Sequence, residues 1–289
     1  MREMTENVRT VRMVRRARPT VEGAGVNLVR AFHAKELPDL DPFLMLDDFH
    51  SDDPADYRAG FPFHPHRGME TVTYMVKGST EHRDSMGNQG TTGPGEVQWM
   101  TAGRGIVHEE MPRGDDGVQG FQLWINLPSR SKMMPPRYQN IGREAIPVTK
   151  PSNDVEVKVI AGSFNGAVGP VKDLVVPIEY LDVRMEPGGR FEHGVPRKRS
   201  AFAYVFQGVG SFGDASAAGP ENLVVLGDGD VVRVRASDQG VRFLLVSGEP
   251  VREPMAWRGP VVMNTDAELR QAFEEIEAGT FVEGPASGM

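Results

Sequence analysis

Short segments in which apolar and polar residues alternate recur along the chain, separated by turns rich in glycine and proline. Alternation with a period of two, together with enrichment in valine, tyrosine and phenylalanine, predicts β-strands. Many short strands without long intervening helices predict an all-β protein built from sandwich or barrel domains. The predicted strands cover residues 70–77, 96–101, 120–127, 155–160, 174–185, 201–206, 222–226, 230–235 and 241–246.

One segment near the end has helical spacing instead. Residues 264–278 place apolar side chains at 269, 272, 273 and 276, which is one face of an α-helix. Thr265 and Glu268 have the spacing of a capping box, and Gly279 follows where a helix would end. We expect this helix to pack over a barrel.

The strand pattern repeats once along the chain. Residues 63–78 (FHPHRGMETVTYMVKG) and 192–208 (EHGVPRKRSAFAYVFQG) both end in a strand followed by glycine, and Tyr74 matches Tyr204. Residues 93–97 (GPGEV) likewise resemble 227–231 (GDGDV). We therefore predict two tandem barrels, one over residues 1–134 and one over residues 135–289 with the helix. The junction is the proline-containing stretch 127–139.

Composition excludes several classes of protein and site. The 289 residues contain no cysteine, so disulfides and thiolate metal sites are impossible. A net charge of −8 disfavours direct nucleic-acid binding, and the basic cluster at residues 9–18 is interpreted as solvated surface or strand edge. No apolar run approaches the roughly 20 residues that cross a bilayer, and the charged N-terminus does not resemble a signal peptide. We expect a cytoplasmic protein that contacts no membrane.

Two pairs of potential metal ligands occur in the first repeat. His64 and His66 form the first ligand pair, and His108 and Glu110 form the second ligand pair. Residues two apart on a strand share a face, so both pairs can converge inside a barrel. Three imidazoles and a carboxylate suit a divalent first-row metal, and four protein ligands leave positions open for water, dioxygen or a chelating substrate. The alternative is that these are surface or hydrogen-bonded core histidines.

The second repeat keeps only His193, and sequence comparison places Arg242 and Leu244 near the counterparts of the second ligand pair. This asymmetry predicts one metal site per chain. Among neighbouring residues, we interpret Glu70 as a hydrogen-bond acceptor for a ligand histidine, Glu109 as a solvated carboxylate and His82 as a surface residue in a turn. Structural roles are also expected for His33, His50 and His193. An apolar pocket near the metal would draw on Phe61, Phe63, Met69, Trp99, Met111 and Trp124.

The segment 63–112 closely resembles the pirin family, a branch of the cupin superfamily. The motifs that carry the resemblance are HPHRGMETVTYMVKG, HRDSMGNQG and GPGEVQWMTAGRGIVHEEMP. Further similar stretches are FLMLDDF, LPSRSKMMPPRYQ and GPVVMNTDAELRQAFEEIEAGTF, so the resemblance spans nearly the whole chain. Thr101 stands where cupins often have proline, a departure that is itself pirin-like.

The resemblance implies two cupin (jelly-roll) barrels with a mononuclear non-haem iron in the first and no metal in the second. The iron ligands implied are His64, His66, His108 and Glu110, and Glu70 is implied not to be one. Fe(II) is the expected ion, with Mn, Cu, Ni or Zn as alternatives. Two functions remain open, because a fold does not define a function. One is a quercetin 2,3-dioxygenase that opens a flavonol with release of carbon monoxide, with Glu110 accepting the substrate proton. The other is a metal- or redox-responsive regulator acting through a protein partner.

Overall fold

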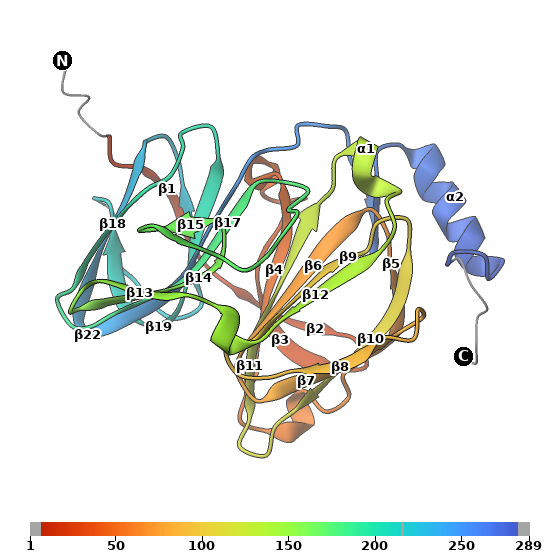
Figure 1. Cartoon of the computed structure of the whole chain (residues 1–289), viewed down its shortest axis with the longest axis horizontal. Helices are drawn as coiled ribbons and strands as arrows, with labels where there is room; N and C mark the ends of the chain where they lie inside the picture. The colour runs from red at the N-terminus through yellow and green to blue at the C-terminus, as the bar shows by residue number, and fades with distance from the viewer. Residues whose placement is uncertain (1–6, 215–216, 283–289) are drawn as a thin grey trace. The chain divides into compact units, whose positions relative to one another are not determined.

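The computed structural model describes residues 7–214 and 217–282, and they form two β-barrels (Figure 1). The predicted all-β fold with a C-terminal helix is therefore confirmed. The helices within the described ranges lack the length and apolar character needed to cross a membrane.

The N-terminal barrel is built from two antiparallel sheets. The larger sheet has the order β12 (Arg137–Ile141), β9 (Val97–Thr101), β6 (Met69–Lys77), β11 (Val118–Asn126), β4 (Phe43–Ser51), β3 (Val26–His33) and β2 (Arg18–Glu22). The smaller sheet has the order β5 (Phe61–His66), β10 (Ile106–Arg113), β7 (Ser79–Asp84) and β8 (Gln89–Thr92). Gly78, between β6 and β7, has a φ of 66°, and an added Cβ would lie 2.7 Å from the Arg113 carbonyl oxygen. Glycine is thus required at this turn.

The C-terminal barrel repeats the same plan. Its main sheet has the order β1 (Val11–Arg16), β21 (Asn222–Leu226), β19 (Ser200–Phe212), β22 (Val231–Gly248), β17 (Ile178–Met185), β14 (Val155–Ala161) and β13 (Val148–Ser152). β18 (Arg190–Gly194) pairs with β22, and β20 (Ala217–Ala218) pairs with β19. β15 (Ser163–Phe164) and β16 (Ala167–Val168) form a small hairpin. The predicted strands 230–235 and 241–246 are one continuous strand, β22, and the second barrel predicted from the repeat is confirmed.

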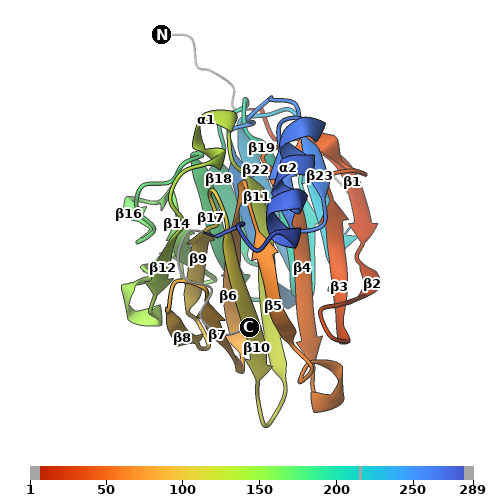
Figure 2. The same ribbon diagram turned by 90° about the vertical axis from the view of Figure 1, so that its right-hand side faces the viewer.

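The prediction divided the chain into two contiguous barrels at residues 134/135. In the structure the N-terminal strand belongs to the C-terminal barrel and the C-terminal segment belongs to the N-terminal barrel. Within the described residues, one compact unit comprises residues 7–18, Ala31–Pro42 and Glu144–Pro250, and the other comprises Pro19–Arg30, Phe43–Arg143 and residues 251–282. β1 completes the C-terminal barrel by pairing with β21. The helix α2 (Asp266–Glu277) belongs to the N-terminal barrel, beside β5 in Figure 2. Alternation and amphipathicity show which face of an element is buried, but not which barrel buries it.

The C-terminal segment adds a short hairpin before α2. β23 (Ala256–Arg258) pairs with β24 (Val261–Met263), and Arg67 forms a bridge with Val261. Thr265 accepts a hydrogen bond from the Glu268 amide and the Glu268 side chain accepts from the Thr265 amide, so the predicted capping box is confirmed. The remaining short elements are α1 (Ser129–Lys132), η1 (Pro38–Leu40), η2 (Pro54–Asp56) and η3 (Arg143–Ala145).

The interior of the C-terminal barrel is apolar. It contains buried valine, leucine and phenylalanine side chains from β14, β17, β19 and β22. The repeat in the sequence predicted that Arg242 and Leu244 lie near the counterparts of the second ligand pair, and this was wrong. Their part of β22 pairs with β17 and β19. It is therefore equivalent to β11, which pairs with β4 and β6 in the N-terminal barrel. The counterpart of β10 is the first part of β22, which pairs with β18 and carries Val232 and Val234. Both valines are buried, so apolar side chains replace ligands there.

Candidate metal centre

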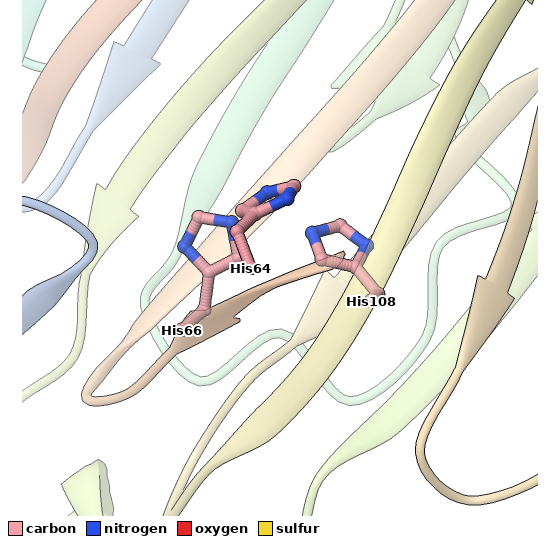
Figure 3. A group of neighbouring side chains, drawn as sticks. All are labelled: His64, His66 and His108. Atoms are coloured by element: carbon pink, nitrogen blue, oxygen red, sulfur yellow. The ribbon is translucent and has the colours of Figure 1, made fainter. Parts of the chain in front are cut away.

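The three histidines meet between β5 and β10. His64 and His66 lie on β5, and His108 lies opposite His64 in the antiparallel register. The ring centroids are 4.8 Å apart for His64 and His66, 4.5 Å for His64 and His108, and 5.0 Å for His66 and His108. A nitrogen from each ring lies within 4.8 Å of the others, and Figure 3 shows the rings turned toward one another. This arrangement can hold one metal ion.

The hydrogen bonds of these rings leave nitrogen lone pairs unused. Nδ1 of His64 lies 2.8 Å from the Pro62 carbonyl oxygen, which assigns the proton to Nδ1 and leaves Nε2 as the basic nitrogen. Neither nitrogen of His108 has a hydrogen-bond partner in the described chain. Neither nitrogen of His66 has a hydrogen-bond partner in the described chain either. Burial lowers the pKa of His66, and the nearby Pro260 carbonyl opposes part of that shift. Because a buried polar atom without a partner costs about 1–3 kcal/mol, the free lone pairs fit a metal.

Glu110 lies beside the histidines but is already hydrogen-bonded. Its carboxylate accepts from Thr73 Oγ1 at 3.0 Å and from Gln122 Nε2 at 2.7 Å, and Oε2 lies 4.0 Å from His108 Nε2. A bulge in β5 lies opposite the stretch from His108 to Glu110, since His108 faces His64 and Glu110 faces Phe61. The structure thus groups three of the four predicted ligands directly and places the fourth, buried, next to them.

Glu109 and Glu70 differ from their sequence-based interpretations. Glu109 points away from the histidines as predicted, but it pairs with Arg83 at 2.5 Å and its side chain is only 13% exposed. Glu70 is fully buried on β6 and accepts a hydrogen bond from Thr101 Oγ1 at 2.6 Å, with no bond to a ligand histidine among the described contacts. Burial raises the pKa of the Glu70 carboxyl. Threonine at position 101 thus serves as the partner of Glu70.

His82 is the site residue that the sequence reasoning missed. It lies on β7 rather than in a turn, is buried, and faces Glu110 in the β7–β10 register. The Gln98 amide lies 2.7 Å from its Nδ1, and its ring stacks on Tyr138 with centroids 5.8 Å apart. The alternation of residues 80, 82 and 84 was the available signal, and the adjacent Gly-containing turn obscured it. Burial lowers the pKa of His82, so the ring is neutral beside the candidate ligands.

The predicted apolar surroundings are present in part. Trp124 packs edge-on against His66 with centroids 5.1 Å apart, and its indole nitrogen donates to Gln122 Oε1 at 3.0 Å. Met69 and Trp99 are fully buried. Met111 instead lines a groove of about 570 Å³ on the outer face of the smaller sheet, together with Arg83 and Glu109. Trp124 thus contacts His66 and also fixes Gln122, the residue that donates to Glu110.

The basic cluster near the N-terminus is compensated by acidic partners. Arg12 pairs with Asp39, Arg15 and Arg18 pair with Glu36, and Arg16 pairs with Glu221. Arg9 is buried and donates to backbone carbonyls. These pairs agree with the interpretation of residues 9–18 as strand surface.

Acidification should destabilise the metal-free protein. Burial, reinforced by the neighbouring imidazoles, holds the pKa of His66 and His108 well below the ordinary 6.5. Below pH 6.5 the unfolded chain therefore binds protons that the folded chain does not, and the free energy of unfolding falls by up to about 1.4 kcal/mol per pH unit for each histidine. Urea unfolding at pH 7.5, 6.5 and 5.5 measures this slope. His108→Leu should show a smaller slope, since one of the two histidines is gone and the other groups are unchanged, and equal slopes for both proteins would contradict the assignment.

Known proteins match almost the entire chain. The family described as "Pirin" matches residues 25–125, and the one described as "Pirin C-terminal cupin domain" matches residues 180–282. A pirin-like protein of Caulobacter vibrioides is 45% identical over 95% of this chain and 99% of its own. Human pirin is 42% identical over 89% of this chain and 88% of its own. The crystal structure of a quercetin 2,3-dioxygenase from Acinetobacter baumannii has a TM-score of 0.89 at 32% identity and covers 95% of this chain and 98% of that chain.

Proposed function

Because this chain belongs to the pirin family, we propose that it is a mononuclear non-haem metal dioxygenase acting on flavonols such as quercetin. The observation that carries the proposal is the convergence of three imidazoles, two of which, His66 and His108, have buried ring nitrogens without a hydrogen-bond partner in the described chain. The similarity to the Acinetobacter baumannii quercetin 2,3-dioxygenase supports the substrate class. The reaction would insert both atoms of dioxygen into the flavonol and release a depside and carbon monoxide.

His64, His66, His108 and Glu110 are the proposed ligands of one divalent ion. Fe(II) is the first choice, and Mn, Cu, Ni and Zn are alternatives that the same nitrogen and oxygen donors accept. His64 would bind through Nε2, since the Pro62 carbonyl occupies Nδ1. For Glu110, coordination requires that the carboxylate exchange or share its bonds to Thr73 and Gln122.

Glu110 is also the proposed general base. A bound divalent ion lowers the pKa of a chelating hydroxyl and offers the open coordination positions that dioxygen chemistry needs. Glu110 would accept the proton of the flavonol 3-hydroxyl. The Gln122 amide, fixed by Trp124, keeps the carboxylate oriented before and after the transfer. His82 is buried opposite Glu110 on the neighbouring strand β7.

A second candidate function is a metal- or redox-responsive regulator that binds a protein partner. The observation that favours it is the alternation on β10, where Glu109 follows His108 and reaches the outer face of the sheet. There it pairs with Arg83, whose side chain is 63% exposed. A change of charge at the metal could thus alter an exposed ion pair. Equal capture of a partner by the metal-free protein and by both oxidation states would exclude this redox switch.

The dioxygenase proposal predicts one tightly held metal ion per chain and loss of quercetin under air. Elemental analysis of protein purified without added metal measures the first quantity. The loss of quercetin absorbance with the protein loaded with Fe(II), Mn(II), Cu(II) or Ni(II) measures the second, and the same metal ion without protein is the control in each case. Two tightly held ions would contradict the single site, because the C-terminal barrel presents valines where ligands would stand. No turnover with any metal would overturn the assignment of activity.

A further inference from the structure

The C-terminal segment 251–282 packs on the outer surface of the histidine-bearing strands at Val107. Val107 on β10 lies in one apolar cluster with Val261, Ala272 and Phe281. Leu269, Phe273, Ile276 and Val282 pack against the same cluster. Val107 precedes His108, and in the register it faces Pro65. The histidines and this cluster therefore occupy opposite faces of the same two strands.

Arg67 joins this segment to the end of β5. It follows His66 directly, and its side chain is about 5% exposed. Its guanidinium pairs with Glu275 at 2.6 Å, donates to the Phe281 carbonyl at 3.0 Å and to the Arg104 carbonyl, and lies 4.2 Å from the Phe281 ring centroid. Each of the three guanidinium nitrogens thus has its own acceptor. A buried charge with this many partners is costly to disturb.

The backbone beside His66 is held by the same segment. The Arg67 amide donates to the Pro260 carbonyl at 3.3 Å, and the Val262 amide donates to the Arg67 carbonyl at 3.0 Å. The buried ammonium of Lys132 donates to the carbonyls of Gly68 and Val262 at 2.8 and 3.0 Å. An added Cβ at Gly68 would lie 1.9 Å from the Val262 carbonyl oxygen, so this close approach requires glycine.

We propose that Arg67 is a positioning residue and that the C-terminal segment, through Glu275 and Phe281, holds His66 and His108 at the separation a metal ion needs. The proposal rests on the metal centre proposed above. Its physical basis is that the segment packs against Val107 on the outer face of β10 and is hydrogen-bonded to the Arg67 backbone at the end of β5, so loosening the segment lets the two rings move apart. Residues that orient metal ligands typically change metal affinity by about 10–100-fold.

Glu275→Gln tests this coupling with little change in shape. The variant keeps the side-chain volume but removes the charge opposite Arg67. Glu274→Gln is the matched control, since Glu274 is the preceding residue and is exposed. We expect Co(II) and Ni(II) to leave Glu275→Gln about tenfold faster when a chelator is added, and the visible spectrum of the Co(II) protein to change. Glu274→Gln should match the unmodified protein, and identical release and spectra for all three would overturn the proposal.

Amide hydrogen exchange of the metal-free proteins keeps the coupling separate from the metal assignment. Loosening the segment should speed exchange in the peptides containing residues 61–68 and 105–108 in Glu275→Gln, with the C-terminal barrel unchanged. If the unmodified chain binds no metal but exchange rises as expected, the metal proposal fails and the coupling stands. Unchanged exchange in both peptides would refute the coupling whether or not metal binds. Arg67→Lys keeps the charge but replaces three donor nitrogens in a planar fork with a single nitrogen, so its exchange should rise by less than in Glu275→Gln.

Discussion

Replacing His108 with leucine should abolish metal binding and at the same time stabilise the metal-free protein. Loss of one of three converging imidazoles should lower metal affinity by more than about 100-fold, since loss of an outer partner of a ligand already costs 10–100-fold. Neither ring nitrogen of His108 has a hydrogen-bond partner in the described chain, so an apolar side chain of similar size removes an unfavourable burial. The expected gain is about 1–3 kcal/mol in the free energy of unfolding. Elemental analysis and urea unfolding measure the two effects.

His193→Leu is the matched control and should behave in the opposite way. His193 lies in the C-terminal barrel with its Nε2 2.8 Å from Glu179 Oε1, and Glu179 is 8% exposed. Leucine would leave that carboxylate buried without its partner, which should cost about 1–3 kcal/mol. Metal content should not change, because the candidate ligands lie in the other barrel. If His108→Leu kept the metal, or if His193→Leu released it, the ligand assignment would have to be abandoned.

Glu110→Gln should remove flavonol turnover while the protein remains folded. The glutamine oxygen can still accept from Gln122, and the Thr73 hydroxyl can turn to accept from the new amide group. The negative charge and the proposed base are lost, however. We expect metal affinity to fall by about 10–100-fold and turnover by at least about 100-fold. Chelator competition and quercetin consumption at saturating metal separate these two losses.

Glu109→Gln provides the comparison one residue away. It removes an ion pair with Arg83, whose exposed guanidinium limits the effect on stability to about 1 kcal/mol. Metal content and turnover should stay as in the unmodified protein. If Glu109→Gln released the metal and Glu110→Gln did not, the register of β10 would be displaced by one residue and the second ligand pair would be misassigned.

The local sequence was sufficient to predict the elements around the site. Alternation predicted β6, β9, β14, β17 and β21 to within a few residues, and β21 without error. The capping box at Thr265 and Glu268 and the positive φ of Gly279 agree with the predicted ends of the helix. The spacing of His64, His66 and His108 predicted that they share a site, because strand parity sets which side chains lie on one face. The strands, the helix ends and the shared face of His64 and His66 depend on residues close in sequence, whereas the approach of His108 also requires the pairing of β5 with β10.

Other features of the site depend on contacts between distant segments. The ring of His82 contacts Gln98 on β9 and Tyr138 on β12, and the alternation along residues 80–84 indicates a shared face but not these partners. The same applies to Glu70, whose hydrogen-bond donor is Thr101 on β9 rather than a histidine. The partner of Glu70 follows from the pairing of β6 with β9 in the larger sheet, and the partners of His82 follow from the packing of the smaller sheet against the larger one. A single sequence does not reveal that pairing or that packing.

The sequence alone therefore determined the all-β class, the repeat, the terminal helix and the residue types available to a metal, since each of these follows from short-range periodicity and donor chemistry. Tertiary structure decided that β1 completes the C-terminal barrel and that α2 covers the strands bearing His66 and His108. An amphipathic face indicates only that its apolar side chains must be buried, and packing against any apolar surface buries them. Which surface does so is decided by long-range packing, and here it places Glu275 and Phe281 directly behind the candidate metal centre.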